Sequence, residues 1–392
     1  MHINNYLTGR TLRQFMNSER SGGFVLIFCT LVSLILTNSS IGKYYLAIWD
    51  FHVGTHSLAH WINDGLMAIF FLLVGLELIQ EIREGELSNI KRASLPISAA
   101  LGGMLIPAAI YLFLNYGKDT ESGYGIPMAT DIAFALGILS LLGNRVPTSL
   151  KVFLTALAVI DDLGAILVIA LFYTTSFSWI SFLCSIAIFI SLLLLNKVFK
   201  IKNIFPYILG GVFMWFFMLQ SGIHATIAGV LLAITIPFEK KQPECLSNKM
   251  QHALHYPVTF FILPLFALAN TAIIIEGGWE RSAAEPFALG IILGLVIGKP
   301  VGIILFSMIM VKLKLSSLPN GVKWKEMIGV AMLGGIGFTM SIFITLLAFK
   351  DNMQYINDSK LMILIASLAA GIAGYVWLNF VLSKNKKALT KL

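Results

Sequence analysis

The segment VFLTALAVIDDLGAILVIALFY, from Val152 to Tyr173, determines the class of this protein. It is almost wholly apolar, and as an α-helix rising about 1.5 Å per residue it spans the roughly 30 Å hydrocarbon core of a bilayer. Two adjacent aspartates, Asp161 and Asp162, lie near its middle. A carboxylate at that depth costs about 2.5–3.5 kcal/mol on insertion scales, so we expect the pair to have a function. Binding a cation or a proton is the simplest one.

The composition extends this interpretation to the whole chain. Of 392 residues, 57% are hydrophobic and 12% are charged, and the mean hydropathy is +0.83. An ordinary soluble domain carries about 25% charged residues. We therefore expect an all-α polytopic membrane protein in which residues 1–392 form a single integral-membrane domain. The polar N-terminus lacks the features of a signal peptide, so the first span should be retained. Three widely spaced cysteines exclude a disulfide framework and a Cys-based metal site.

Apolar runs separated by polar breaks predict about twelve spans. They cover residues 22–38, 59–80, 95–115, 124–143, 150–174, 179–197, 204–220, 223–237, 252–275, 286–310, 328–349 and 359–382. Runs 204–220 and 223–237 are short, so one or both should be tilted or partly embedded. Between the first two spans, KYYLAIWDFHVGTHS (Lys43 to Ser57) is compatible with an extracytoplasmic β-hairpin or with an irregular loop.

The distribution of basic residues predicts the orientation in the membrane. If loops alternate between the two sides, most of the 28 Lys and Arg residues fall on one side. The other side receives Lys43, Lys118, Arg281, Lys350 and Lys360. The positive-inside rule then places both termini in the cytoplasm. The net charge of +8 follows from this topology, so no nucleic-acid partner is needed.

Two predicted spans carry helix breakers near their middle. GYGIPMATD contains Gly123, Gly125 and Pro127, and LGGIGFTMS contains Gly334, Gly335 and Gly337. In a helix interior, Gly costs about 1 kcal/mol and Pro about 3 kcal/mol relative to Ala. Each broken span is the second of three, in spans 3–5 and 10–12, and the two triplets start on opposite sides. This pattern is typical of a transporter with an inverted repeat and two interrupted helices that cross at the midplane. Close packing or simple kinks are the alternative.

Six charged residues fall inside predicted spans: Asp64, Glu77, Asp131, Asp161, Asp162 and Lys299. Adjacent helical residues point about 100° apart, so Asp161 and Asp162 must face different neighbours. Lys299 can compensate one of them, while the other faces a water-filled cavity. Asp131 and Lys299 would also balance the dipole ends of the interrupted helices. A network that only holds helices together is the alternative, but two carboxylates and one lysine leave the site net negative.

Such a site suits a small cation such as Na⁺ or Li⁺. Thr130, backbone carbonyls and water could complete its coordination. Desolvation and a like-charged neighbour also favour the protonated form of a carboxylate, so cation and proton can compete for one site. Competition in a cavity open to one side at a time is sufficient for antiport. No cofactor motif is present, and without a phosphate-binding loop ATP-driven transport is not expected.

Six motifs in their expected order closely resemble the NhaA family of bacterial Na⁺/H⁺ antiporters. They are ATDIAFALGIL (Ala129 to Leu139), LAVIDDLGAI (Leu157 to Ile166), SGIHATIAGV (Ser221 to Val230), LPLFALANTA (Leu263 to Ala272), GKPVGI (Gly298 to Ile303) and GGIGFTMSIFI (Gly334 to Ile344). The resemblance runs through nearly the whole chain. It implies an electrogenic exchanger of the bacterial inner membrane that expels Na⁺ or Li⁺ and admits protons, and it implies a homodimer joined partly through the hairpin. The core bundle would hold spans 3–5 and 10–12, and the remaining spans would form the interface side.

The resemblance also implies roles for individual residues. Asp162 would be the principal ion ligand, and Asp161 would bind the ion or pair with Lys299. Thr130 and Asp131 would lie where the interrupted helices cross. The passage or the pH response would involve Asp64, Glu77, Glu81, His224, His252 and His255. His224 on its own is more typical of a packed or capping residue.

The chain departs from the family pattern at the entrance to the site. After GLE it reads Ile79 and Gln80, where basic residues are common, and Gln251 stands where an acidic residue often precedes the two histidines. We therefore expect a shifted or flatter pH activation. Other functions remain open: transport of K⁺ or of a weak acid, a channel, or an intramembrane aspartyl protease. The protease is disfavoured because its two aspartates would have to lie on facing helices.

Overall fold

The computed structural model describes residues 19–173, 177–240, 242, 244–275, 279–350 and 352–389. The helices up to residue 115 are α2 (Glu19–Thr37), α3 (Gly42–Asp50), α4 (Leu58–His60), the π-helical η1 (Trp61–Leu66), α5 (Met67–Arg83), η2 (Glu86–Ser88) and α6 (Ile90–Asn115). Then follow η3 (Glu121–Met128), α7 (Ile132–Leu141), η4 (Gly143–Arg145), α8 (Thr148–Phe172), α9 (Trp179–Lys197), α10 (Phe205–Gln220) and α11 (Ile227–Thr235). The last are α12 (Leu246–Pro257), η5 (Val258–Ile262), α13 (Leu263–Asn270), α14 (Trp279–Ala284), α15 (Pro286–Leu293), η6 (Gly294–Gly298), α16 (Lys299–Lys312), α17 (Trp324–Gly334), α18 (Phe338–Ala348) and α19 (Met353–Leu389).

The protein is a multi-pass helical membrane protein, as its composition predicts. Within the described ranges, eight helices are long and apolar enough to cross a bilayer, or up to ten if each of two bent pairs counts as one span. Twelve spans are therefore not reproduced as twelve continuous helices. The runs 204–220 and 223–237 form only short helices, α10 with 16 residues and α11 with 9. The run 252–275 instead begins at Leu246 and ends at Asn270.

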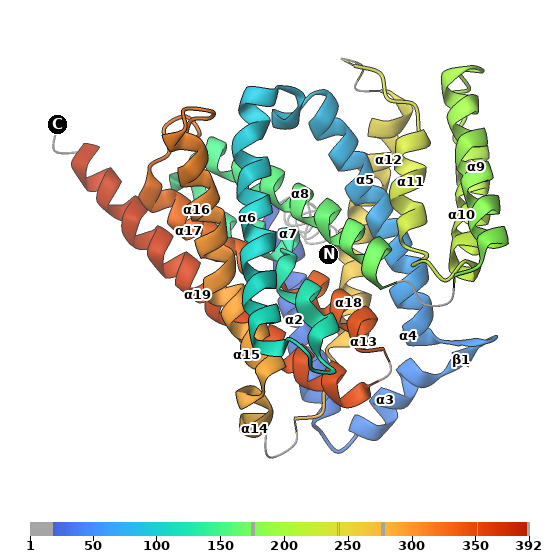
Figure 1. Ribbon diagram of the computed structural model, residues 1–392, viewed down its shortest axis with the longest axis horizontal. Helices are drawn as coiled ribbons and strands as arrows, with labels where there is room; N and C mark the ends of the chain where they lie inside the picture. The colour runs from blue at the N-terminus through green and yellow to red at the C-terminus, as the bar shows by residue number, and fades with distance from the viewer. Residues whose placement is uncertain are drawn as a thin grey trace, which may run out of the picture.

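The hairpin between the first two spans is present but short. β1 (His52–Val53) pairs antiparallel with β2 (His56–Ser57), and the turn between them holds Gly54 at φ +69°. The preceding residues from Gly42 to Asp50 are helical (α3). In Figure 1 the hairpin, α3 and α14 lie at the bottom, and the loops after α5 and α16 lie at the top. We call these the hairpin end and the loop end.

Both predicted helix interruptions exist, and one lies later than its glycines suggest. Gly125 and Pro127 lie inside the 3₁₀ helix η3, and the extended residues are Ala129, Thr130 and Asp131, just before α7. The second interruption separates α17 from α18 at Gly335 to Gly337, with a bend of 43°. Pro lacks an N–H and Gly carries no side chain, but the tight η3 helix tolerates both. The helical structure is therefore interrupted at Ala129 to Asp131, where Thr130 and Asp131 carry polar side chains.

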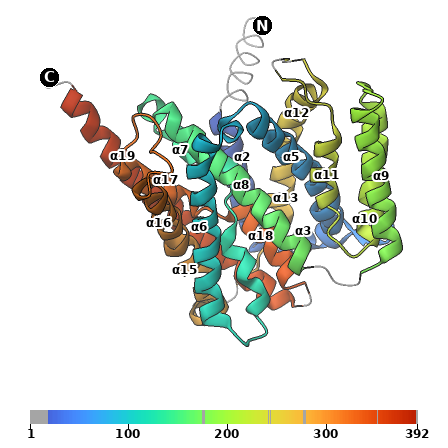
Figure 2. The same cartoon turned by 45° about the horizontal axis from the view of Figure 1, so that its top comes forward.

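The helices pack in two groups on either side of α8. In Figures 1 and 2, α9, α10 and α11 stand at one edge of the molecule, α16, α17 and α19 stand at the other, and α8 crosses between them. The smaller group has its own apolar core, which includes Leu76 of α5, Leu192 of α9, Met214 of α10 and Leu232 of α11. The larger core joins α5 and α8 to the helices around both interruptions.

Lys360 was counted with the basic residues on the less basic side, at the very start of the predicted span 359–382. It lies inside α19, and only 8% of its surface is exposed. The sequence around it is apolar only on its C-terminal side, so a loop boundary drawn from hydropathy falls too late. The long helix α19 begins at Met353 and carries this lysine into the packed region.

Candidate functional site

Asp131 caps two helices at once where the interruptions meet. Its Oδ1 accepts a 2.9 Å hydrogen bond from the backbone N–H of Phe134 in the first turn of α7. Its Oδ2 accepts a 3.1 Å bond from the backbone N–H of Thr339 in the first turn of α18, and also a bond from the Thr339 hydroxyl. The two interruptions are joined by a 2.7 Å hydrogen bond in which the Asp131 N–H donates to the carbonyl oxygen of Ile336. A negative side chain therefore faces two helix N-termini, where the dipoles favour it.

Positive and neutral donors face the opposite helix ends. The Lys299 ammonium donates to the carbonyl of Met128, which ends η3. Thr130 Oγ1 lies 2.8 Å from the carbonyl oxygen of Gly334, the last residue of α17, and 2.8 Å from Asp161 Oδ2. Because a hydroxyl has one proton, it can donate to only one of these oxygens at a time. Where the interruptions meet, the carboxylate of Asp131 therefore accepts from helix N-termini, and the donors Lys299 and Thr130 bind the carbonyls at helix C-termini.

Asp161 and Lys299 form a fully buried ion pair. Lys299 Nζ lies 2.9 Å from Asp161 Oδ2, and neither side chain is exposed. Asp161 Oδ1 has no hydrogen-bond partner among the described residues. The intramembrane lysine thus compensates one aspartate of the adjacent pair, the arrangement that the 100° offset between neighbours predicts. The π-helical η6 immediately precedes Lys299.

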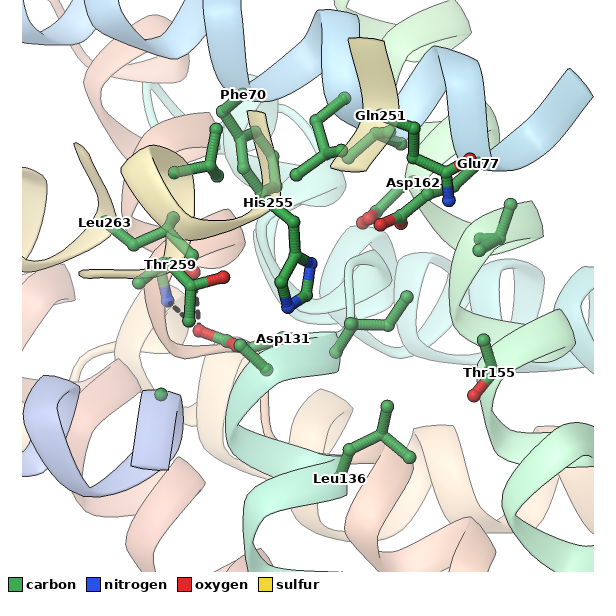
Figure 3. A pocket seen from close by; sticks show the side chains of 18 of the residues that line it. Phe70, Glu77, Asp131, Leu136, Thr155, Asp162, Gln251, His255, Thr259 and Leu263 are labelled. Carbon is green, nitrogen blue, oxygen red and sulfur yellow. Dashed lines mark hydrogen bonds between the residues drawn. The ribbon is translucent and has the colours of Figure 1, made fainter. Parts of the chain in front are cut away.

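Asp162 faces a different environment, a cavity of about 380 Å³. The polar and charged side chains that line it include Glu77, Gln80, Glu81, Asp131, Thr155, Asp162, Gln251, His255, Thr259 and Thr339. In Figure 3, His255 projects into the space between Asp131 and Asp162, and Glu77 lies beside Asp162. Asp162 Oδ1 is buried and has no hydrogen-bond partner within the described ranges. A buried carboxylate oxygen without a hydrogen-bond partner can accept a proton or a cation.

The charges around Asp162 are mainly negative. Asp161, Asp131 and Glu77 act on it as like charges, and Lys299 is the opposing cation. No Lys or Arg is among the described residues that line the cavity. No three His, Cys, Asp or Glu side chains in the described part of the chain are grouped closely enough to hold a metal ion by themselves. A cation here would therefore need water, hydroxyl or backbone oxygens as further ligands.

Comparison with known proteins matches this site to a family. The model of the family described as Na⁺/H⁺ antiporter 1 matches residues 13–378. The chain belongs to this family. It is 60% identical to the Na⁺/H⁺ antiporter NhaA 1 of Flavobacterium johnsoniae, over 96% of this chain and 98% of the relative. It is 58% identical to the Na⁺/H⁺ antiporter NhaA of Flavobacterium psychrophilum, over 94% and 96%, and 56% identical to the NhaA of Cytophaga hutchinsonii, over 95% and 96%. Members are named as antiporters, so the chain is a transporter and not an enzyme.

The remaining predicted residues of this family member divide between the two ends. Glu77, Glu81 and His255 line the cavity with Asp162, whereas His252 is exposed and does not line it. Asp64 and His224 lie near one another, and Asp64 is close to the hairpin. The six passage residues therefore do not form one cluster.

Thr339 is the main residue that sequence reasoning missed. It binds Asp131 through both its backbone N–H and its hydroxyl. The signal was present in the sequence, because Thr339 follows the second interruption much as Thr130 ends the first. Thr155 and Thr259 also line the cavity, but nothing in their apolar surroundings distinguishes them from packed threonines.

Proposed function

We propose that this protein exchanges cytoplasmic Na⁺ or Li⁺ for external protons. One observation carries the proposal: Asp162, a buried carboxylate with an unpartnered oxygen, lines a cavity next to a second aspartate that is paired with a lysine. The family and the names of relatives up to 60% identical support the same activity. Na⁺ and H⁺ are then substrates, and no bound cofactor is required.

Competition for Asp162 provides the exchange. When Asp162 is protonated it is neutral, and it can remain in the apolar interior at little cost. When it loses the proton, Na⁺ or Li⁺ can neutralise it, with Asp161, Thr130, backbone carbonyls and water as further oxygen ligands. An uncompensated carboxylate is costly in the apolar interior, so the ionised form of Asp162 is favoured only when a cation occupies the site. The site therefore carries either a proton or a cation, which is the condition for obligatory exchange.

Asp161 and Lys299 make the exchange electrogenic in this proposal. If a cation draws Asp161 away from Lys299, the lysine loses its compensating charge and favours release of its proton. Two protons would then be exchanged for one Na⁺. Either Asp161 or Lys299 can carry the second proton, and both alternatives give the same net charge movement.

The architecture that we propose completes the mechanism. Twelve membrane crossings include an inverted repeat around η3–α7 and α17–α18, and this core bundle moves against the remaining helices to expose Asp162 to one side at a time. Both termini and the loop end face the cytoplasm of a bacterial inner membrane, and the hairpin end faces outward. Two copies form a homodimer, in which the hairpin takes part.

The decisive experiment is Na⁺-induced collapse of a pH gradient in everted membrane vesicles. Wild type and Asp162→Asn are compared between about pH 6.5 and 8.5, which brackets neutral pH. We expect wild type to respond to Na⁺ and Li⁺, and Asp162→Asn to lose the response. Asp119→Asn, at an acidic residue of the hairpin end outside the cavity, is the matched control.

Equal membrane levels and equal melting temperatures of the variants separate lost transport from lost folding. If wild type does not respond to Na⁺ or Li⁺ at any pH, the Na⁺/H⁺ assignment is wrong. The same assay with K⁺ and with weak acids then tests the other proton-coupled substrates.

A further inference from the structure

Lys360 is a buried amine that the proposed exchange does not use. It lies about two turns inside α19, counted from Met353, and only 8% of its surface is exposed. No described residue forms an ion pair or a hydrogen bond with its amine. The hydroxyl of the neighbouring Ser359 is also buried without a hydrogen-bond partner in the described ranges. Ionisable residues inside membrane spans normally pair with one another or with carbonyls, so an unpaired one indicates a function.

The main elements that pack against α19 offer this amine no counter-charge. α7, α15, α18 and η6 contain no charged residue and no histidine. α17 carries Lys325 and Glu326 in its first turn at the loop end, and α14 carries the exposed Glu280 and Arg281. On α19 itself Asp358 is two residues away, and side chains at that spacing do not face each other. An unpaired ammonium is so costly in this setting that the amine stays neutral.

A polar groove at the hairpin end comes close to this position. It has a volume of about 690 Å³, lies beside α14 (Figure 1), and is lined in part by Glu285, Tyr355 and Asp358. Asp358 precedes Lys360 by two residues, or about 3 Å along the helix axis. The flexible four-carbon stem of a lysine exceeds that distance. A small movement of α19 would therefore bring the amine into groove water.

The face of α19 that carries Lys360 also supports the second interruption. Buried residues recur along this face at helical spacing: Ile356, Lys360, Ile363, Ser367 and Ala370. The Ser367 hydroxyl oxygen accepts a 3.1 Å hydrogen bond from the backbone N–H of Phe338, the first residue of α18. A Cβ built on Gly335 would lie 3.3 Å from the Ala370 Cβ. Lys360 thus shares a helix face with residues that position the N-terminus of α18.

We propose that Lys360 is a regulatory proton-binding site that responds to the pH of external water. The inference rests on the proposed function, because it assigns a control to that exchange. With a neutral amine, α19 packs as in this structure and supports the α18 N-terminus, which Asp131 caps. When the amine binds a proton from groove water, the ammonium must reach water, and this face of α19 has to leave the core. The second interruption then loses its support, and acidic external water slows exchange.

The first measurement is thermal unfolding in detergent between about pH 7 and 9.5, below the ordinary lysine titration near pH 10.4. Lys360→Met keeps a long, unbranched side chain and removes the amine. Unfolding exposes Lys360, which takes up a proton, so the unfolded wild type binds more protons and wild-type stability falls as the pH falls. We expect Lys360→Met to melt at a higher temperature than wild type, by a margin that grows toward pH 7. Lys43→Met, at an exposed lysine of α3, should melt like wild type at every pH.

The second measurement is ²²Na⁺ efflux from right-side-out vesicles at a fixed internal pH, with the external pH varied from about 6 to 9. The ratio of Lys360→Met efflux to wild-type efflux should rise about threefold or more toward acidic external pH, since one proton can change a population up to about tenfold per pH unit. Lys360→Arg stays charged throughout and should be slow at every external pH. Lys43→Met should match wild type. In everted vesicles the ratio should not depend on cytoplasmic pH.

A Lys360→Met protein that melts below wild type would overturn the proposal, because the amine would then hold a contact that the packed protein needs. A melting difference that is constant with pH, or an efflux ratio that is constant with external pH, would overturn it as well. If wild type moves no Na⁺, the proposed function fails and the control of exchange fails with it. The melting difference then still decides whether Lys360 is a proton-binding site.

Discussion

At the residue scale, the buried charges of the crossing are placed so that each has a partner of opposite sign or dipole. Asp131 meets the N-termini of α7 and α18, and Lys299 meets Asp161 and the end of η3. A buried ion pair gains little over apolar packing, but an unpaired buried charge is very costly. Both aspartates keep one oxygen without a hydrogen-bond partner, but Lys299 forms its ion pair with Asp161 and not with Asp162, so Asp162 is the exception that indicates function.

The Asp161–Lys299 pair makes a specific stability prediction. Lys299→Gln should lower the unfolding free energy by about 3–5 kcal/mol, because it leaves the Asp161 carboxylate unpaired. Adding Asp161→Asn should recover much of that loss. Thermal unfolding in detergent measures both, and the double variant should also show exchange that depends less on membrane voltage. An unchanged melting temperature for Lys299→Gln would contradict the pair.

Thr339 provides a second prediction at this scale. Thr339→Val removes the hydroxyl that donates to Asp131 and should cost about 1–3 kcal/mol, because a buried carboxylate loses a donor. Thr345→Val on the same helix is the matched control. Its hydroxyl only returns to the Ser341 carbonyl, 2.9 Å away, so its loss should cost less than about 1 kcal/mol. Equal melting temperatures for the two variants would show that the Thr339 hydroxyl has no special role.

At the element scale, α6 and α16 cross with their backbones in close approach. A Cβ built on Gly302 would lie 2.0 Å from the carbonyl oxygen of Gly102, and a Cβ on Gly102 would lie 2.2 Å from that of Gly302. Neither backbone can yield without moving α16, which carries Lys299 one turn earlier. The close contact between α6 and α16 therefore fixes the position of Lys299 along its helix axis relative to Asp161.

Gly302→Ala should separate these helices. We expect a loss of about 1–3 kcal/mol in stability, with a larger loss of exchange because Lys299 shifts. Gly65→Ala is the matched control, since the nearest atom to its Cβ is 3.9 Å away, on Trp61. Ala is a better helix former than Gly, so this variant should be neutral or slightly more stable. A Gly302→Ala protein that melts and exchanges like wild type would show that the contact between α6 and α16 tolerates a methyl group.

The sequence predicts such elements when a local signal marks them. Hydropathy revealed the long helices. Glycines, with Pro127 in the first case, revealed both interruptions, because these residues act on their own backbone. The boundaries of η3 and α11 were missed, since a short helix depends on its neighbours rather than on its own composition. The Asp161–Lys299 pairing was predictable because the sequence offered a single basic residue in the middle of a predicted span and few carboxylates to pair with it. The contacts of Thr339 and of the Phe343 ring depend on helix packing and left no signal in the chain.

At the whole-molecule scale, the two ends of the protein differ in their ionisable groups. The cavity that reaches Asp162 holds Glu77, Glu81 and His255, while the hairpin end holds Asp64 with nearby histidines. The buried Phe71, Phe266 and Phe343 rings pack together in the interior. An exchanger needs two separate approaches to one site, and the two ends of this protein differ in the groups they would offer to each approach. Changes at the cavity should therefore affect the response to cytoplasmic pH alone.

The cavity's uncharged Gln80 and Gln251 allow that expectation to be tested. Both line the cavity, and no described Lys or Arg lines it. Besides Asp131 and Asp162, the acidic and histidine residues that line the cavity are Glu77, Glu81 and His255. We expect wild type to show a flat or shifted dependence on cytoplasmic pH, because few charged groups respond together.

Gln80→Lys/Gln251→Glu should steepen that dependence and displace activation toward alkaline pH. The added ammonium repels Na⁺ and is screened only when nearby acids are ionised, so exchange should need more hydroxide than in wild type. Everted vesicles at saturating Na⁺ give the cytoplasmic pH profile, and right-side-out vesicles give the external one. Gln354→Lys is the control for a change in net charge alone, because Gln354 lies at the hairpin end and does not line this cavity. If the double variant alters the external profile as much as the cytoplasmic one, the two approaches are not separate, because a charge at one end then governs protonation at the other.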